Sequence, residues 1–167
     1  MLYLLDASVL ITANNTYYPL ERVPEFWGWI VHHATLGSIK LPQEIYDEVL
    51  PGRKNDDPLP DWMREHRDVL VLDEAVDPTL VQTVVTRGYA PDLTDEEIEE
   101  IGRDPFLIAY AMAGAERCVV TVEPSSPRKR RQNRRIPDVC TTCDVASCDP
   151  FAVYKALAFS TAWKAST

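Results

Sequence analysis

The sequence predicts an α/β fold in which a largely parallel central sheet of four to five strands lies between two layers of helices. Apolar runs without polar alternation are typical of strands that are covered on both faces. Such runs alternate along the chain with segments of helical apolar spacing, and this alternation is typical of a parallel sheet. The expected strands are residues 2–5, 37–41, 69–72, 118–122 and, at one edge of the sheet, 136–139.

Helix boundaries are indicated by capping residues and prolines. Asp77 before Pro78 is a cap residue followed by proline in the first turn, and Thr94 and Glu97 have the spacing of a capping box. Residues 106–113 are apolar on almost every side, so we expect that helix to be buried. The expected helices are residues 24–35, 43–50, 61–67, 78–87, 106–113 and 150–159.

Length and composition are those of a single domain that spans residues 1–167. No run approaches the roughly 18 apolar residues that a membrane span needs. The N-terminus also lacks the basic start and apolar segment of a secretory signal. We therefore expect a cytoplasmic protein without membrane contact.

The charge of the chain is unevenly distributed. Its net charge is −9, yet residues 128–135 contain six Lys and Arg, so the rest of the chain carries −15. A protein this acidic needs cations to contact a polyanion such as RNA. The basic segment is either such a contact, a solvated loop, or a docking site for an acidic partner.

The first candidate functional residue is Asp6, which follows the strand at residues 2–5 and precedes Ser8. Ligands of open α/β sheets bind at the carboxyl ends of the strands. The alternative is that Asp6 or Ser8 only caps the next helix. Nearby Asn14, Asn15 and Tyr17 are either substrate contacts or residues of a turn.

Three further carboxylates have comparable positions. A helical projection places Glu48 at the border of the apolar stripe of its helix and Asp47 on the solvent side. Asp104 precedes Pro105 at the start of the buried helix, where it serves as an N-cap, a metal ligand, or both. Glu123 follows the strand at residues 118–122 and repeats the arrangement of Asp6.

A group of four carboxylates is costly unless a cation neutralises it, because the charges raise each other's pKa. Mg²⁺ and Mn²⁺ are the expected cofactors, since both prefer oxygen ligands. An ion held in this way can activate water and bind a scissile phosphate.

These residues resemble a known family. The segments around Asp6, Glu48, Asp104 and Glu123 have the order and approximate spacing of the PIN domain, and the chain is most similar to a PIN-like group with the pattern of VapC-type toxin ribonucleases. The resemblance covers nearly the full length. It implies a metal-dependent endoribonuclease whose catalytic residues are Asp6, Glu48, Asp104 and Glu123, with metal ligands at Asp6, Asp104 and Glu123 and supporting hydroxyls at Ser8 and Thr121.

The resemblance also implies an RNA substrate, a cognate antitoxin and a homodimer. The chain departs from the family pattern at Glu123, where Asp is common, and in the length of its basic segment. We expect that segment to be a mobile loop that contacts RNA through Arg128, Lys129, Arg130, Arg131, Arg134 and Arg135.

Other interpretations remain open. One alternative is a PIN fold that has lost its catalytic activity and serves as a scaffold. Another is an RNA-processing nuclease that is not paired with an antitoxin. A haloacid-dehalogenase-type phosphatase is disfavoured, since it needs a second Asp where this chain has Ser8. Cys140 and Cys143 have the spacing of half a zinc site, and Cys148 and Cys118 are the remaining thiols, so a second matched pair is missing.

Overall fold

A four-stranded parallel sheet forms the centre of the protein, whose computed structural model describes residues 1–52 and 56–165. The strand order is β2-β1-β3-β4, and Leu4 of β1 is paired with Lys40 of β2 and with Val119 of β3. The strands are β1 (Leu2–Leu5), β2 (Ile39–Lys40), β3 (Arg117–Val120) and β4 (Ala146–Cys148). The predicted parallel α/β fold is therefore confirmed.

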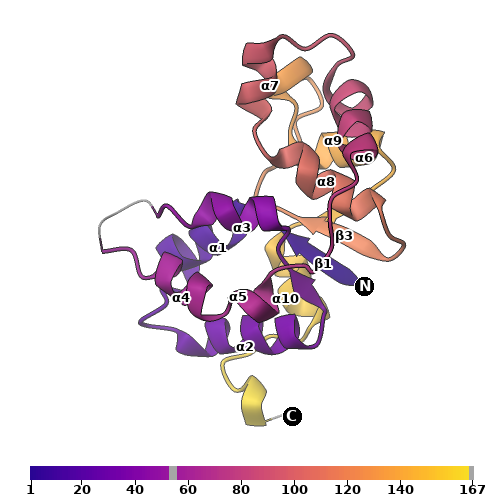
Figure 1. Ribbon diagram of the computed structural model, residues 1–167. Coiled ribbons are helices and arrows are strands. Elements are labelled where there is room, and N and C mark those ends of the chain that lie inside the picture. Colours follow the sequence, from indigo (N-terminus) through magenta and orange to yellow (C-terminus); the bar gives the residue numbers. More distant parts are fainter. Residues whose placement is uncertain (53–55, 166–167) are drawn as a thin grey trace.

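Helices cover the sheet on both sides and complete three layers (Figure 1). Helices α6 to α9 lie on one side, and α1 to α5 lie with α10 on the other. The bounds are α1 (Ala7–Thr12), the π-helix η1 (Ala13–Tyr17), α2 (Pro24–Thr35), α3 (Gln43–Val49), α4 (Leu59–Glu65), α5 (Arg67–Leu70), α6 (Pro78–Thr83), the π-helix η2 (Val84–Tyr89), α7 (Asp95–Ile101), α8 (Asp104–Met112), the 3₁₀-helix η3 (Arg131–Asn133), α9 (Ile136–Thr142), α10 (Pro150–Ala156) and the 3₁₀-helix η4 (Trp163–Ala165).

Local sequence signals account for several helix ends. The helix predicted at residues 24–35 is α2. Thr94 and Glu97 form the predicted capping box of α7. Asp77 caps α6 by accepting a hydrogen bond of 2.8 Å from the N–H of Thr79, and Asp149 accepts one of 3.0 Å from the N–H of Ala152 in α10.

Two predicted strands are wrong. Residues 69–72 begin within helix α5, and only Val71 makes a bridge to Leu41 beside β2. Residues 136–139 form the first turns of α9, where Pro137 is tolerated because its missing N–H has no intrahelical partner there. The edge of the sheet is instead β4, which has only three residues, Ala-Ser-Cys, and carries no strong strand signal.

The core includes the helix α8, as its apolar sequence predicted, and extends to α2 and α3. Leu107 and Ile108 of α8 are fully buried, as are Leu4 of β1 and Val119 of β3. Within residues 1–52 and 56–165, no helix has the length and apolar character to cross a membrane.

Candidate active site

Asp6 lies directly after β1, at the carboxyl end of the sheet, and its side chain is buried. Its Oδ2 accepts hydrogen bonds from the hydroxyls of Ser8 and Thr121, the latter at 3.0 Å. Burial raises the pKa of Asp6 and nearby Glu123 adds to the rise, whereas the two hydroxyls lower it. Ser8 and Thr121 therefore orient the Asp6 carboxylate.

Asp104 is the first residue of α8 but does not cap it. The N-cap position is Arg103, whose carbonyl accepts the N–H of Phe106 at 3.0 Å, so the predicted capping role of Asp104 is wrong. The pKa of Asp104 is raised to about 8, first by burial and then by the charges of Asp6, Glu123 and Glu48 in that order, while Arg135 lowers it. The three other predicted acids thus act electrostatically on this carboxyl group.

Glu123 lies three residues beyond the end of β3, because the strand stops at Val120 rather than at residue 122. Its Oε2 accepts the N–H of Ile136 at 3.0 Å, and its Oε1 pairs with Arg135 at 3.1 Å. Both oxygens therefore hold the start of α9. This arrangement favours an indirect role for Glu123 at a metal, as its extra methylene group also suggests.

Glu48 does not border the core as the helical projection predicted. Both Glu48 and Asp47 are exposed on α3, and Asp47 accepts a hydrogen bond of 2.7 Å from Gln43. Glu44 is instead the half-buried acid of this helix, since its Oε2 is buried without a hydrogen-bond partner among the described residues. The projection failed because α8 packs against α3 and covers the Glu44 side of the helix. Glu48 still acts on Asp104 electrostatically.

The four acids come from four different parts of the fold, and three of them act electrostatically on Asp104, but they do not form a ready coordination shell. No group of three or more His, Cys, Asp or Glu side chains in the described part of the chain is arranged to hold a metal ion. Mg²⁺, however, is usually bound through one or two carboxylates and several waters. Asp6 and Asp104 fit such an ion, because both supply carboxylate oxygens as ligands. Both also have raised pKa values, which a bound cation would lower.

Tyr89, at the end of η2, is a residue of this site that the sequence analysis missed. Its side chain is buried, and its hydroxyl makes no hydrogen bond to any described residue. Burial raises its pKa, and Asp104 and Glu123 are the nearest charges that contribute. Its hydroxyl therefore stays protonated and remains available as a donor. No sequence signal marks it, because it follows Gly88 in an ordinary turn-like context.

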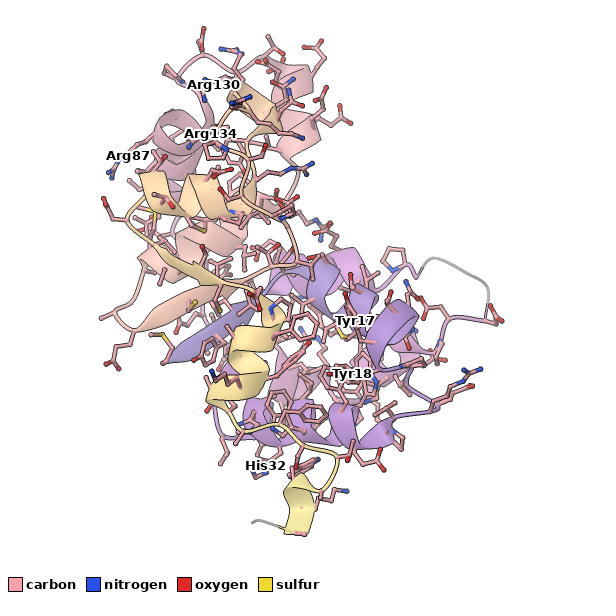
Figure 2. All side chains as sticks on the ribbon, turned by 180° about the vertical axis from the view of Figure 1, so that it is seen from behind. Tyr17, Tyr18, His32, Arg87, Arg130 and Arg134 are labelled. Carbon is pink, nitrogen blue, oxygen red and sulfur yellow. The ribbon has the colours of Figure 1, made fainter. Side chains whose placement is uncertain are left out.

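The basic segment, residues 128–135, is held to the protein at several points, so the predicted mobile loop of free cations is wrong. Arg131 pairs with Glu97 at 2.7 Å and with Asp92 at 2.8 Å. Arg134 donates to the carbonyls of Gly88 and Asp138. Figure 2 shows Arg130 and Arg134 within the group of helices α6 to α9.

The remaining cations of the segment have fewer partners. Arg135 pairs with Glu123, and Arg130 donates to the nearby carbonyls of Pro127 and Lys129. Arg128 is exposed, and neither it nor Lys129 forms an ion pair with a described residue. Contact with RNA through this segment remains a prediction for Arg128, Lys129 and Arg130.

The four cysteines do not form a zinc site as they stand. Cys140 and Cys143 are buried on α9, and the Sγ atoms of Cys118 and Cys148 lie 3.5 Å apart on neighbouring strands. All four are free thiols, and no group of three or more possible metal ligands occurs in the described residues.

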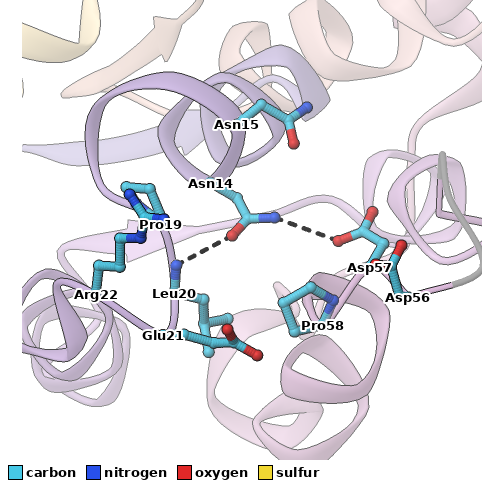
Figure 3. Close-up of a pocket in the computed structure, with 9 residues that line it drawn as sticks. All are labelled: Asn14, Asn15, Pro19, Leu20, Glu21, Arg22, Asp56, Asp57 and Pro58. Atoms are coloured by element: carbon cyan, nitrogen blue, oxygen red, sulfur yellow. Dashed lines mark hydrogen bonds between the residues drawn. The ribbon is translucent and has the colours of Figure 1, made fainter.

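Asn14 and Asn15 line a separate cavity of about 350 Å³ beside Arg22 and residues 56–58 (Figure 3). Asn14 accepts the N–H of Leu20 at 3.1 Å and donates to Asp57 at 3.2 Å. Asn14 thus links η1 to the segment before α4, which agrees with the alternative that it stabilises a turn.

Comparison with known proteins gave one family. A model described as a domain of unknown function (DUF4411) matches residues 3–161, which include all four acids. A search of curated proteins and a search of solved structures found no match.

Proposed function

We propose that this chain, which belongs to the DUF4411 family, is a divalent-metal-dependent ribonuclease that hydrolyses phosphodiester bonds. The observation that carries the proposal is the environment of Asp104. Its pKa of about 8 results from burial and from three carboxylates on other elements. A protein gains nothing in stability from such repulsion, so the arrangement indicates a cation-binding role.

The residues that would hold the ion are Asp6 and Asp104, with Glu123 acting indirectly. Bound Mg²⁺ or Mn²⁺ would supply Lewis-acid chemistry, which activates water and stabilises charge on the scissile phosphate. Ser8 and Thr121 fix the orientation of Asp6 by donating to its Oδ2. Asp104 loses its proton when the ion binds, since a nearby cation favours the ionised carboxylate. Tyr89 has a free hydroxyl that can donate to an anionic substrate group.

A cleavage assay with single-stranded RNA oligonucleotides and either Mg²⁺ or Mn²⁺ tests this function. Asp6→Asn and Asp104→Asn should each lower cleavage by about a thousand-fold or more, because the amide keeps the size of the side chain but not the charge. Asp77→Asn is the matched control, since it makes the same change at a helix cap outside the site. Wild-type cleavage that persists in EDTA, or an active Asp6→Asn variant, would contradict the proposal.

The more specific assignment is the toxin of a toxin–antitoxin pair, and it rests on the resemblance to VapC-type ribonucleases. Growth arrest on expression, relieved by Asp6→Asn and by the product of a small neighbouring gene, is the expected result. Cleavage without growth arrest would favour an RNA-processing nuclease. A homodimer is expected from the same resemblance, and light scattering of the purified protein measures it.

The scaffold alternative is favoured by one observation, which is that Glu123 holds the start of α9 with both of its oxygens. If the protein is a scaffold, Glu123→Gln should destabilise the fold. The wild-type protein should then cut no RNA with either Mg²⁺ or Mn²⁺. Wild-type inactivity on a mixed RNA pool would therefore favour the scaffold over the nuclease.

A further inference from the structure

A small aromatic cavity adjoins the carboxylate site at the carboxyl ends of β1, β3 and β4. Its volume is about 130 Å³, and its walls come from α1 and η1, from the residue before Glu123, and from the start of α10. Val9 in its wall follows Ser8 in the chain, and Val122 precedes Glu123. The cavity and Asp6 therefore lie at the same end of the sheet.

The rim of the cavity exposes apolar and aromatic side chains to solvent. Tyr17 is 52% exposed, Phe151 is 51% exposed and Val122 is 38% exposed, and these are three of the six large hydrophobic residues that are exposed in the described part of the chain. Their gathering at one small cavity, rather than scattered over the surface, is typical of a ligand site.

The aromatic rings are arranged at right angles. The ring centroids of Tyr17 and Phe151 are 5.3 Å apart at an interplanar angle of 80°, and Phe151 lies 5.7 Å from Tyr154 at 79°. Figure 2 shows Tyr17 beside the C-terminal helix α10. An edge-to-face pair covers only one face of one of its two rings, and an uncovered aromatic face stacks favourably on another flat ring.

We propose that this cavity holds an unpaired nucleobase of the RNA, next to the phosphate at the carboxylate site. This inference rests on the proposed function, and it specifies that the substrate is single-stranded at that position. A base in a duplex is stacked and paired, so it cannot enter such a cavity.

The charge of the surroundings favours a base over a phosphate or an anionic peptide. Asp149 lines the cavity, and its Oδ1 accepts the N–H of Ala152 at 3.0 Å. A carboxylate repels phosphate but accepts hydrogen bonds from an exocyclic amino group of a base. Stacking on aromatic rings also requires no basic surface, which suits a chain of net charge −9. The competing occupant is an apolar side chain of a partner protein.

Binding without cleavage gives the most direct test. A single-stranded heptaribonucleotide that carries 2-aminopurine at one position in turn is titrated with the protein in EDTA. Stacking quenches 2-aminopurine fluorescence, so we expect quenching at one position and little at the others. Tyr17→Ala and Phe151→Ala should each weaken binding by about ten-fold and abolish the quenching.

Conservative and matched variants separate stacking from folding. Tyr17→Phe keeps the ring and should bind as the wild type does. Ile98→Ala removes another exposed apolar side chain, on α7, and should change nothing. Thermal melts of each variant report whether the fold is kept.

The outcomes distinguish this inference from the proposed function. Absence of quenching at every position with the wild type, or unchanged binding by Phe151→Ala, would overturn the base-binding site, and the latter would favour a protein side chain as the occupant. Lack of cleavage with Mg²⁺ and Mn²⁺ would overturn the nuclease, and it is measured in a separate assay that leaves the binding result intact.

Discussion

The carboxylate site and the basic segment at residues 128–135 are two charged regions of the chain whose charges have opposite environments. Asp6 and Asp104 lie among other acids, and their pKa values are raised. Arg131, in contrast, is paired with two acids, and it lowers the pKa of Glu97 to about 2. Charges that repel one another indicate a site for a ligand, whereas charges already paired within the protein stabilise the fold.

The difference also concerns distance along the chain. The six cations lie within eight consecutive residues, yet their partners lie on different elements. The four acids are dispersed: Asp6, Glu48 and Asp104 lie more than forty residues from one another in the sequence. Asp6, Glu48 and Glu123 nevertheless all raise the pKa of Asp104. A dense run of charge in the sequence is therefore a weaker guide to a site than dispersed charges that the fold brings together.

Glu48 and Asp47 are exposed neighbours on α3, and we expect substitutions of the two to have very different effects on cleavage. Glu48 acts on Asp104, so Glu48→Gln should lower the rate of RNA cleavage by about a hundred-fold. Asp47→Asn should change the rate by less than about two-fold, because Asp47 is hydrogen-bonded to Gln43 on the outer side of α3. Single-turnover cleavage rates measure both. Equal effects of the two changes would remove Glu48 from the site.

Asp104→Asn should stabilise the protein while it abolishes cleavage. The pKa of Asp104 rises from an ordinary value of 3.8 to about 8 in the folded protein, so the folded state binds more protons between these pH values. The free energy of unfolding of the wild type therefore falls as the pH rises from about 4 to about 8. The Asn variant lacks this loss, so its gain in unfolding free energy over the wild type should be larger at pH 8 than at pH 4, by an amount on the order of 5 kcal/mol.

Urea unfolding at pH 4, 6 and 8 in EDTA measures this advantage. Excess Mg²⁺ should raise the stability of the wild type at pH 8 and leave Asp104→Asn unchanged, since binding to the folded state alone stabilises it. A variant that is less stable than the wild type at every pH would show that the Asp104 carboxyl has a structural role instead.

Tyr89→Phe tests whether the unpaired hydroxyl belongs to the site. The hydroxyl is buried without a partner among the described residues, so its removal should leave the fold intact or slightly more stable. Cleavage should fall by about ten-fold if the hydroxyl donates to the substrate. Comparison of kcat with KM, together with a thermal melt, is the measurement. A loss of stability without a change in rate would indicate a structural hydroxyl.

The smallest effects are expected in the basic segment, where Arg131→Gln and Arg128→Gln form a matched pair. Arg131→Gln should lower the Tm by a few degrees at pH 7, because it leaves Glu97 and Asp92 without their partner. The loss should vanish as the pH falls from about 4.5 towards 2, where Glu97 becomes protonated in either state. Arg128→Gln should leave the Tm unchanged.

RNA binding should respond in the opposite way. Arg128 is exposed and has no ion-pair partner among the described residues, so Arg128→Gln should flatten the salt dependence of binding by about 0.7 in slope. Arg131→Gln should leave that slope unchanged. The reverse result would show that Arg131 exchanges its acidic partners for phosphate when RNA binds.

Sequence reasoning was most successful where a signal is local. The capping box at Thr94 and Glu97, the cap at Asp77 and the bounds of α2 follow from neighbouring residues, and each was predicted. It failed at residues 69–72 and 136–139, since short apolar segments fit either a strand or a helix and the packing of the neighbours decides between them. At the site, the order of the four acids was visible, but the exposure of Glu48 and the presence of Tyr89 were not.

The sequence by itself determined the class of the fold and the positions of Asp6 and Asp104 at the ends of buried elements. It also determined that the candidate ligands are oxygen atoms, which hard cations prefer. These features could be predicted because periodicity, capping and side-chain type act over a few residues. Only the tertiary structure decided that Arg131 and Arg134 bind acids and carbonyls of the protein, that Glu123 holds the start of α9, and that Tyr17 and Phe151 meet at one cavity. Apart from the bond between Arg134 and Asp138, these contacts join residues that are 12 to 134 positions apart in the sequence. Local preferences act over a few residues, so the packing of the whole chain decides which of these distant groups meet.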